Sequence, residues 1–269
     1  MTYRQGRESR NGFVGTVLLL LALSAGSSGA IDLETARLID LTHPFDETTI
    51  YWPTARHFQL EVVAHGETPG GWWYAANNFC AAEHGGTHMD APIHFAEGHW
   101  TADEVPLERL VGPAVVVDLR ARVAGDRDAM LRVQDLETEE SAHGRIPDAA
   151  VVLVRTGWSR YWPDPTSYLG TAVAGDTTHL HFPGVSGEAA SWLVTQRRIR
   201  AVGIDTASID RGQSRDFRAH RVFGGANVPI FENLAALDAL PVRGATFVGL
   251  PMKIRGGSGG PLRAIAALP

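Results

Sequence analysis

Side chains that can bind a metal ion are concentrated between residues 84 and 94. His84, His88 and His94 bring three imidazoles into this short segment, and Asp90 adds a carboxylate. Neutral imidazole and carboxylate are ligands that divalent zinc, manganese and iron accept in proteins. The whole chain has 11 histidines in 269 residues, so composition alone does not account for this crowding. The segment therefore predicts a metal site.

The spacing of the first two histidines favours a loop or a distorted strand over a helix. His84 and His88 are four residues apart, which would place them on one face of a helix. Gly85 and Gly86 lie between them, however, and two adjacent glycines cost roughly 2 kcal/mol in a helix interior. We therefore expect an irregular backbone here rather than a metal-binding helix.

An extended backbone after the glycines would bring the ligands together. His88 and Asp90 are two residues apart, so on a strand both side chains point to the same side. Pro92 bars a regular helix and biases the residue before it towards extended geometry. His94 follows two residues later, close enough to reach the same pocket. These residues predict a metal held by His84, His88 and Asp90, with His94 free for proton transfer.

The composition is that of an ordinary soluble globular protein. Of the 269 residues 44% are hydrophobic and 20% charged, with a net charge of −6 and a pI of about 6.0. No run of lysines and arginines is present, so nucleic acid is not an expected partner. The length suits one large domain, and no linker divides it.

The N-terminus has the pattern of a secretory signal peptide. Three arginines in the first ten residues precede an apolar run over 13–23, and small residues follow over 24–30. We predict a signal peptide at 1–30, cleaved after Ala30, and a mature domain at 31–269 that is exported to the periplasm or beyond. The apolar run is short for a membrane span. An uncleaved anchor or a misplaced start codon is the alternative, and without a true signal the chain would be cytoplasmic.

Apolar runs and turn residues predict the main elements. We expect strands that alternate with only a few helices, and hence a mixed α/β or α+β single domain. Ser186 is the expected N-cap of the main helix, and a flexible glycine-rich loop is expected over 256–261. The expected strands are 38–42, 113–119, 149–154, 199–204 and 246–254, and the expected helices are 187–195 and 233–240.

The remaining chemically active side chains have no such context. Cys80 is the only cysteine, so no intramolecular disulfide can form, and we expect it to be a small buried apolar residue. The six histidines that lack neighbouring ligand types are expected to be structural or solvated; they are His43, His57, His65, His99, His143 and His179.

The segment 84–95 resembles a signature of the cyclase-like metal-dependent hydrolases, His-x-Gly-Thr-His-x-Asp-x-Pro-x-His-Phe. That family includes the bacterial kynurenine formamidases and the isatin hydrolases. Weaker similarities cover most of the mature chain, at 39–44, 51–53, 203–210, 220 and 232–234. The resemblance implies a cyclase-like swivelling β/β/α fold, with a mixed-sheet core and few helices, in a single domain.

The resemblance also implies roles for residues of the main motif. His84, His88 and Asp90 would be the ligands of a first metal, and His94 would transfer protons. The implied reaction is hydrolysis of an amide-type C–N bond by metal-activated water, in an aryl formamide or a bicyclic lactam.

A second metal is implied by residues far along the chain. In the dinuclear formamidases the counterpart of Asp90 bridges two metals, and the counterparts of His220 and Glu232 hold the second. Isatin-cleaving relatives are thought to work with one manganese. We therefore expect Mn²⁺ or Zn²⁺, as one ion or two. The family also implies a homodimer or a larger homo-oligomer.

Aromatic residues before the motif suggest the walls of the substrate pocket. Trp52 matches a substrate-facing Trp-Pro of the family, and Trp73 and Phe79 lie in the aromatic and amide stretch 72–79. Flat aromatic walls suit a planar bicyclic substrate. With the signal-like N-terminus, they favour the isatin hydrolase branch, although the substrate itself stays open. No membrane partner is expected after removal of the signal.

Two other kinds of protein fit parts of this pattern. His88 and Asp90 with a distant histidine also outline the iron site of a two-histidine, one-carboxylate oxygenase. That interpretation gives His84 and His94 no role, and it expects a barrel of many short strands. The other alternative is an exported metal-binding protein without catalytic activity.

Overall fold

The computed structural model describes residues 1–2 and 33–269. Residues 33–269 belong to one compact unit, Ile31–Pro269, which contains all the helices and strands named here. Apart from its first two residues, the predicted signal peptide lies outside the described residues. Its cleavage after Ala30 therefore stays a prediction.

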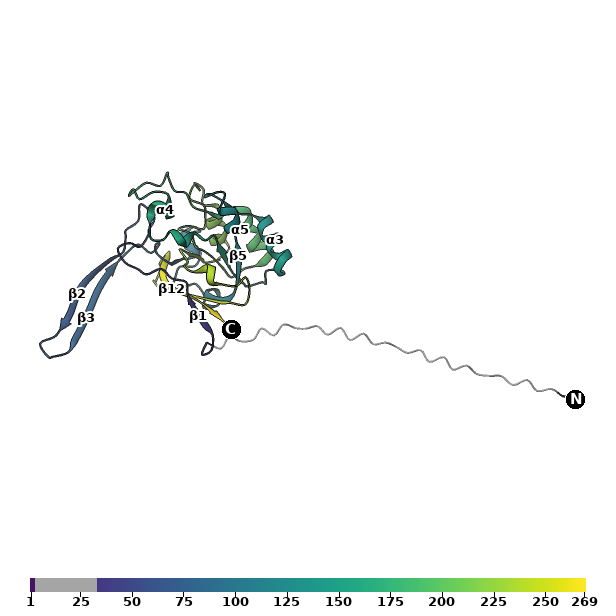
Figure 1. The fold of residues 1–269 in the computed structure, drawn as a ribbon, viewed down its shortest axis with the longest axis horizontal. Coiled ribbons are helices and arrows are strands. Elements are labelled where there is room, and N and C mark those ends of the chain that lie inside the picture. Colours follow the sequence, from purple (N-terminus) through teal and green to yellow (C-terminus); the bar gives the residue numbers. More distant parts are fainter. Residues whose placement is uncertain (3–32) are drawn as a thin grey trace. The chain divides into compact units, whose positions relative to one another are not determined.

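Strands form most of the regular structure (Figure 1). Their bounds are β1 Arg37–Asp40, β2 Gln59–Glu67, β3 Trp73–Cys80, β4 His88–Asp90, β5 Val111–Asp118, β6 Met130–Leu131, β7 Val151–Arg155, β8 Gly184–Val185, β9 Ala201–Ile204, β10 Ile230–Glu232, β11 Thr246–Pro251 and β12 Gly259–Leu268.

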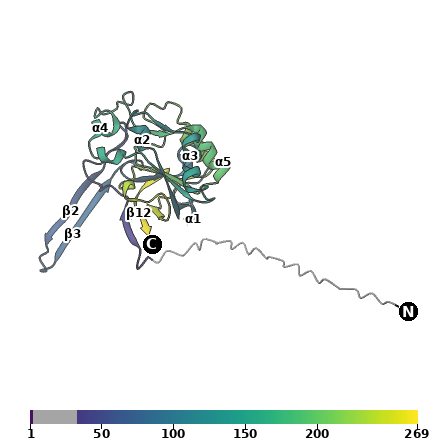
Figure 2. The same ribbon diagram turned by 45° about the vertical axis from the view of Figure 1, so that its right-hand side comes forward.

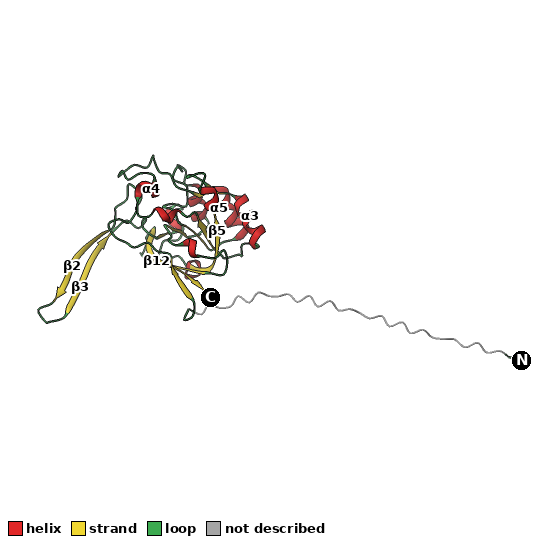
Figure 3. Ribbon diagram, in the orientation of Figure 1, coloured by secondary structure: helices red, strands yellow, loops and turns green. Residues whose placement is uncertain are grey.

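Helices are short, and the two longest, α3 and α5, lie together on one side of the sheet (Figure 3). No helix of the described residues is long and apolar enough to cross a membrane. The α-helices are α1 Leu107–Leu110, α2 Arg120–Val123, α3 Val133–His143, α4 Pro165–Leu169, α5 Gly187–Arg197 and α6 Arg218–Gly225, and the 3₁₀ turns are η1 Pro92–His94, η2 Trp158–Tyr161 and η3 Leu237–Ala239.

One sheet of eight strands carries the fold, in the order β1-β12-β11-β5-β7-β9-β10-β4. The pairs β5–β7, β7–β9 and β9–β10 are parallel, and the other pairs of this sheet are antiparallel. An additional pairing of β12 with β4 closes the sheet into a barrel-like ring. The short strand β4 is therefore held on both edges, which fixes any side chain that it carries.

The central strands are buried on both faces. Val115 and Val117 of β5 face one apolar cluster together with residues of α5 and α6. Ala114 and Val116 face a second cluster with residues of β11 and β12. Such two-sided burial is why these strands are continuous apolar runs in the sequence rather than alternating ones.

Most of the elements expected from these runs are confirmed. The first four predicted strands correspond to β1, β5, β7 and β9, and the main helix corresponds to α5. The Ser186 hydroxyl caps α5 by accepting a hydrogen bond from the Ala189 N–H at 3.1 Å. The mixed α/β single domain with few helices is likewise confirmed.

The C-terminal prediction is wrong in one respect. Strand β11 ends at Pro251 and is not the last strand, because β12 follows from Gly259 to Leu268. The loop expected over 256–261 therefore includes the start of a strand. Gly259 and Gly260 pair with β4 there, where a side chain on Gly259 would collide with β4.

The prediction of a short helix over 233–240 is also wrong. Only Leu237–Ala239 form a single 3₁₀ turn. Asn233 and Ala236 both have left-handed backbone angles, with φ of 53° and 52°. A right-handed helix cannot pass through such residues.

A β-hairpin that the sequence pattern does not predict stands away from the sheet. Strands β2 and β3 pair only with each other, and two views show them projecting from the rest of the unit (Figures 1 and 2). Cys80 ends β3 and is exposed, so the expectation of a buried thiol is wrong. Nearly every side chain of the hairpin is exposed, on both faces.

Candidate metal centre

Strand β4 places the first ligands. His88 pairs with Glu232 of β10, and Asp90 pairs with Gly259 of β12. Because residues directly opposite on neighbouring strands project on the same face, His88, Asp90 and Glu232 share one side of the sheet. His88 and Asp90, two residues apart on β4, thus point to the same side of the sheet, as predicted.

A tight glycine turn brings His84 back over β4. Gly86 has φ +57°, and a Cβ on it would collide with the ring of Phe45. A Cβ on Gly85 would overlap the ring of Tyr51, whose backbone forms a bridge with Gly85. The two glycines are needed because only they fit this turn, which confirms that the segment is not helical.

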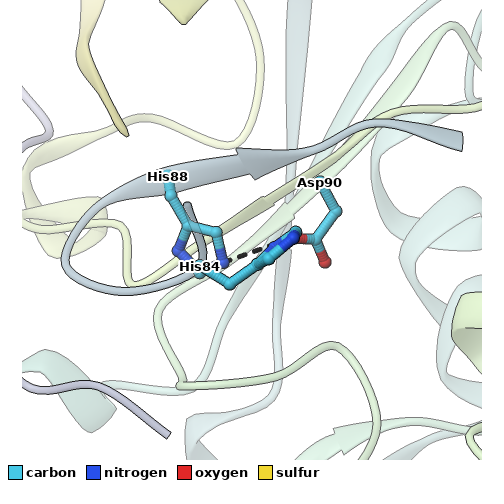
Figure 4. A group of neighbouring side chains, drawn as sticks. All are labelled: His84, His88 and Asp90. Atoms are coloured by element: carbon cyan, nitrogen blue, oxygen red, sulfur yellow. Dashed lines mark hydrogen bonds and ion pairs between the residues drawn. The ribbon is translucent and has the colours of Figure 1, made fainter. Parts of the chain in front are cut away.

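The first group of ligands is closely spaced (Figure 4). His84 Nδ1 lies 2.6 Å from Asp90 Oδ1, and His88 Nε2 lies 3.2 Å from the same oxygen. The other ring nitrogen of His88 donates to the Gly86 carbonyl, with a distance of 2.9 Å. Nε2 is therefore the nitrogen of His88 that faces the centre and would bind an ion there.

A second group shares the same carboxylate. Asp90 Oδ2 lies 3.1 Å from Nε2 of His220, which lies on α6. That nitrogen is also 3.2 Å from Glu232 Oε1. Asp210 Oδ2 accepts from His220 Nδ1 at 2.7 Å, and the Ile209 N–H donates to Glu232 at 2.7 Å. Within each group, every residue offers one ligand atom, and these atoms all lie within 4.8 Å of one another. Asp90 belongs to both groups.

Buried carboxylates control the protonation of this centre. Burial by itself would lower the pKa of His220, but hydrogen bonds with Asp210 and two further carboxylates hold that pKa well above its usual range. Burial and the charge of nearby Asp90 raise the pKa of Glu232. Burial would also raise the pKa of Asp90, but the surrounding imidazoles hold it well below its usual range. The raised pKa values of His220 and Glu232 mean that the centre binds protons, which balance the negative charge of its carboxylates.

This arrangement fits a divalent metal. The donors are imidazole nitrogens and carboxylate oxygens, almost all buried, and a cation would supply the charge that the protons now provide. His84, His88 and Asp90 could hold one ion. His220 and Glu232, with the other oxygen of Asp90, could hold a second.

His94 lies beside the ligands and belongs to neither group. Its ring stacks on that of His84, with centroids 3.8 Å apart and an interplanar angle of 19°. Within residues 33–269, no hydrogen bond to its ring nitrogens is found. Burial lowers the pKa of His94 to about 4, so the ring is neutral at pH 7 and can accept a proton.

The centre forms the floor of a cavity of about 290 Å³. Its walls are largely aromatic and apolar, and they include Trp52, Phe95 and Phe217. Trp52 meets the ring of Phe217 at 6.4 Å. Trp52 thus lies where a substrate-binding residue would be expected, and its role stays a prediction.

Trp73 and Phe79 do not line this cavity. Both lie on strand β3 of the projecting hairpin, where their exposed fractions are 61% and 57%. Their position just before the metal motif predicts pocket walls. Trp73 instead lies near the turn of the projecting hairpin (Figure 1), and Phe79 lies at its base, where its ring stacks on that of Phe58 with centroids 6.0 Å apart. Substrate contact by Trp73 would require a second chain.

Several residues that support the ligands cannot be identified from the sequence. Asp210 orients His220, and Asn233 donates to the Gly86 carbonyl at 2.7 Å, the same atom that His88 contacts. Ser258 lies 2.8 Å from His84 Nε2. Asp210 and Asn233 lie within the weaker similarities, but no property of the sequence reveals that they contact ligands so distant along the chain.

Two histidine-containing groups share the buried carboxylate of Asp90 on a closed mixed sheet. The imidazole of His94, which belongs to neither group, lies beside them. These features together define the class of metal-dependent hydrolases. Residues 39–211 match the model of the Cyclase family, and the chain belongs to that family. This membership confirms the family resemblance and counts against the oxygenase and non-catalytic alternatives.

Named relatives support the same assignment. Isatin hydrolase of Roseibium aggregatum is 31% identical over 205 residues, 73% of this chain and 76% of that protein. Kynurenine formamidase of Sphingopyxis alaskensis is 27% identical over 230 residues, 86% of this chain and 97% of that protein. A solved structure of isatin hydrolase A from Labrenzia aggregata, bound to benzyl benzoate, has a TM-score of 0.79 and 35% identity, covering 87% of this chain and 94% of that one.

Proposed function

We propose that this chain hydrolyses the amide-type C–N bond of a small bicyclic aromatic lactam of the isatin type. The observation that carries the proposal is the shared carboxylate of Asp90 at the floor of an aromatic cavity, with His94 beside it. The similarity to isatin hydrolases, in sequence and in fold, supports this class of substrate.

The metal is proposed to be Mn²⁺ or Zn²⁺, with a first ion on His84, His88 and Asp90. His220 and Glu232 complete a second group that can hold another ion. When bound, such an ion lowers the pKa of water and stabilises negative charge on a carbonyl oxygen.

His94 is proposed to be the proton-transfer residue. Its neutral ring takes a proton from the attacking water as the new C–O bond forms, and returns that proton to the leaving nitrogen as the C–N bond breaks. Opening of the lactam ring gives one product that carries both a carboxylic acid and an amine, so water is the only other reactant. Trp52 and Phe95 are proposed to hold the flat ring of the substrate.

Aryl formamides are the second candidate class of substrate, because kynurenine formamidases are also relatives. Absorbance assays on isatin and N-formylkynurenine, with the same metal-loaded enzyme, distinguish the two. We expect a higher kcat/KM for isatin. Turnover of the formamide alone would assign the chain to the other branch, and hydrolysis of neither would overturn the proposal.

Replacing His94 tests its role. We expect His94→Ala to keep its metal and to lose about two to four orders of magnitude in kcat. Rates and metal content are measured on the same samples, with His179→Ala as the control, because that histidine is exposed and lies outside the cavity. Near-normal turnover by His94→Ala would remove His94 from the mechanism.

Export and dimerisation are proposed as well. The sequence of the first 30 residues supports cleavage of a signal peptide after Ala30 and a periplasmic location. Mass spectrometry of the protein from a periplasmic extract should give a mature chain that begins at Ile31. A homodimer is supported by the exposed apolar hairpin.

A further inference from the structure

Two residues outside the proposed ligand set contact His84 from behind. The Ser258 hydroxyl lies 2.8 Å from His84 Nε2, on the side of the ring away from Asp90. The same hydroxyl donates to Glu83 Oε2 at 2.6 Å, and the Ser258 N–H donates to that oxygen at 2.9 Å. Glu83, Ser258 and His84 therefore form a continuous chain of hydrogen bonds.

The direction of these hydrogen bonds follows from counting protons. A serine hydroxyl has a single proton, and Ser258 donates it to the carboxylate of Glu83. Towards His84 the hydroxyl can then only accept, so Nε2 of His84 carries the N–H. Nδ1 is then the nitrogen that faces the centre, 2.6 Å from Asp90 Oδ1, and it is the atom that would exchange its proton for an ion.

We propose that Glu83 and Ser258 are positioning residues that fix the tautomer and orientation of His84, so that Nδ1 is its metal-binding atom. His84 then differs from His88, which presents Nε2 because its Nδ1 donates to Gly86. A ligand histidine commonly gives its second N–H to a carboxylate or another acceptor, which holds the ring in place. Here the carboxylate of Glu83 acts through the hydroxyl of Ser258.

The loop that carries Ser258 is built to hold this contact. The Ser258 carbonyl accepts from the Ala91 N–H at 2.8 Å, beside β4. Asp103 accepts from the Gly256 N–H at 2.9 Å. A Cβ on Gly259 would lie 2.6 Å from His84 Cε1, so glycine at 259 lets the loop approach the imidazole.

Titration of the folded, metal-free protein with Mn²⁺ tests the inference. Electron paramagnetic resonance of free Mn²⁺ gives the affinity, and circular dichroism confirms that each variant is folded. We expect Ser258→Ala and Glu83→Ala to weaken binding of the first ion about 10- to 100-fold. Glu83→Gln should retain most of the affinity, because its amide oxygen can still accept both hydrogen bonds from Ser258.

Asp103→Ala is the matched control, since it loosens the same loop without touching His84. Its affinity should equal that of the wild type. Equal weakening by Asp103→Ala and Ser258→Ala would show that the contact only anchors the loop, and would overturn the inference. Wild-type affinity in Ser258→Ala would also overturn it.

Nitrogen NMR of the ¹⁵N-histidine-labelled, Zn²⁺-loaded protein gives a readout that a purely structural role would not change. We expect Nε2 of His84 to be protonated and Nδ1 to have the shift of a ligand. Ligation through Nε2 would overturn the inference. The inference rests on the metal centre of the proposed function, and failure of the wild type to bind either Mn²⁺ or Zn²⁺ would overturn both. Normal Mn²⁺ binding by the wild type, with the same affinity in Ser258→Ala and Glu83→Ala, would overturn only the positioning role.

Discussion

Asp210 and Ser258 show how single residues outside the ligand set can prepare a metal centre. His88, His220 and His84 each commit the ring nitrogen that faces away from the centre, to the Gly86 carbonyl, to Asp210 and to Ser258 respectively. The remaining nitrogen of each ring faces the carboxylates. Such orientation before binding reduces the entropy that would be lost when an ion is bound.

Removing the charge of Asp210 tests this role at His220. We expect Asp210→Asn to weaken Mn²⁺ binding at the second group, His220 and Glu232, roughly 10- to 100-fold. The amide keeps only one oxygen, whereas the Ala219 and His220 N–H groups now donate to Oδ1 and Oδ2 separately, so circular dichroism is used to check that the variant is folded. Calorimetric titration measures affinity and stoichiometry, with Asp216→Asn, a nearby exposed carboxylate, as the control. Unchanged binding of every ion would refute the role of Asp210.

His43 should make the fold sensitive to acid. Burial lowers its pKa to about 4, against about 6.5 in an unfolded chain. Because protonation favours the unfolded state, its contribution to stability is complete above pH 6.5 and is lost as the pH falls towards 4. At pH 5 the loss should approach roughly 2 kcal/mol relative to pH 7.

Urea unfolding of a His43→Phe variant measures this effect. Phenylalanine can keep the stacking on Trp162, whose ring centroid lies 4.2 Å from that of His43, and it cannot take up a proton. The variant should lose less stability between pH 7 and pH 5 than the wild type does. His143→Gln, which replaces a more exposed imidazole on α3, should behave as the wild type. An equally steep loss in His43→Phe would contradict the assignment.

Among the elements, the close approach of β12 to β4 depends on a glycine. A Cβ on Gly259 would lie 2.5 Å from the Met89 carbonyl oxygen and 2.6 Å from the His84 ring. Gly259→Ala should therefore separate these strands and lower both the thermal unfolding midpoint and Mn²⁺ affinity. Gly125→Ala, where the added Cβ makes only an ordinary contact at 3.8 Å, is the control. Equal melting and binding by the two variants would disprove the role of Gly259.

The same elements explain which features the sequence could predict. Strands β5, β7 and β9 are apolar on both faces and stand out as continuous runs. Strand β12 begins with Gly259, Gly260 and Pro261, residues that usually indicate a loop, and only tertiary pairing makes them extended. The hairpin lacks the alternation of buried and exposed residues, because both of its faces are exposed.

Some residues of the candidate site could likewise be grouped from the sequence, and others could not. His84, His88 and Asp90 are close in sequence, so spacing alone could group them. His220 and Glu232 join them through α6 and β10, and only the family resemblance links these residues before the fold is known. The contact between His84 and Ser258 spans 174 residues, and no local pattern predicts such a pair.

In the molecule as a whole, the projecting hairpin presents an exposed apolar surface. An isolated two-stranded hairpin is at best marginally stable in water, and this one exposes Leu60, Val62, Trp72, Trp73 and Phe79 by more than half. A second copy of the chain would cover these side chains and could bring Trp73, near the turn of the hairpin, to a neighbouring cavity. We therefore expect the mature protein to be a dimer.

Light scattering after size-exclusion chromatography tests the dimer. Trp73 and Phe79 are six residues apart on β3 and lie on the same face, so Trp73→Lys combined with Phe79→Lys should give a monomer. Asn78→Lys, a polar position on the other face, should remain dimeric. A monomeric wild type, or a double variant that stays dimeric, would exclude this surface.

Hydrolysis is expected to depend on the ion bound by the centre around Asp90. The most direct test follows isatin hydrolysis while Mn²⁺ is added back to metal-free protein, with bound ions counted in the same samples. We predict that the rate rises in proportion to the first ion bound and that Asp90→Asn binds little metal and remains inactive at every concentration. Full hydrolysis by the metal-free protein, or by Asp90→Asn, would contradict this dependence.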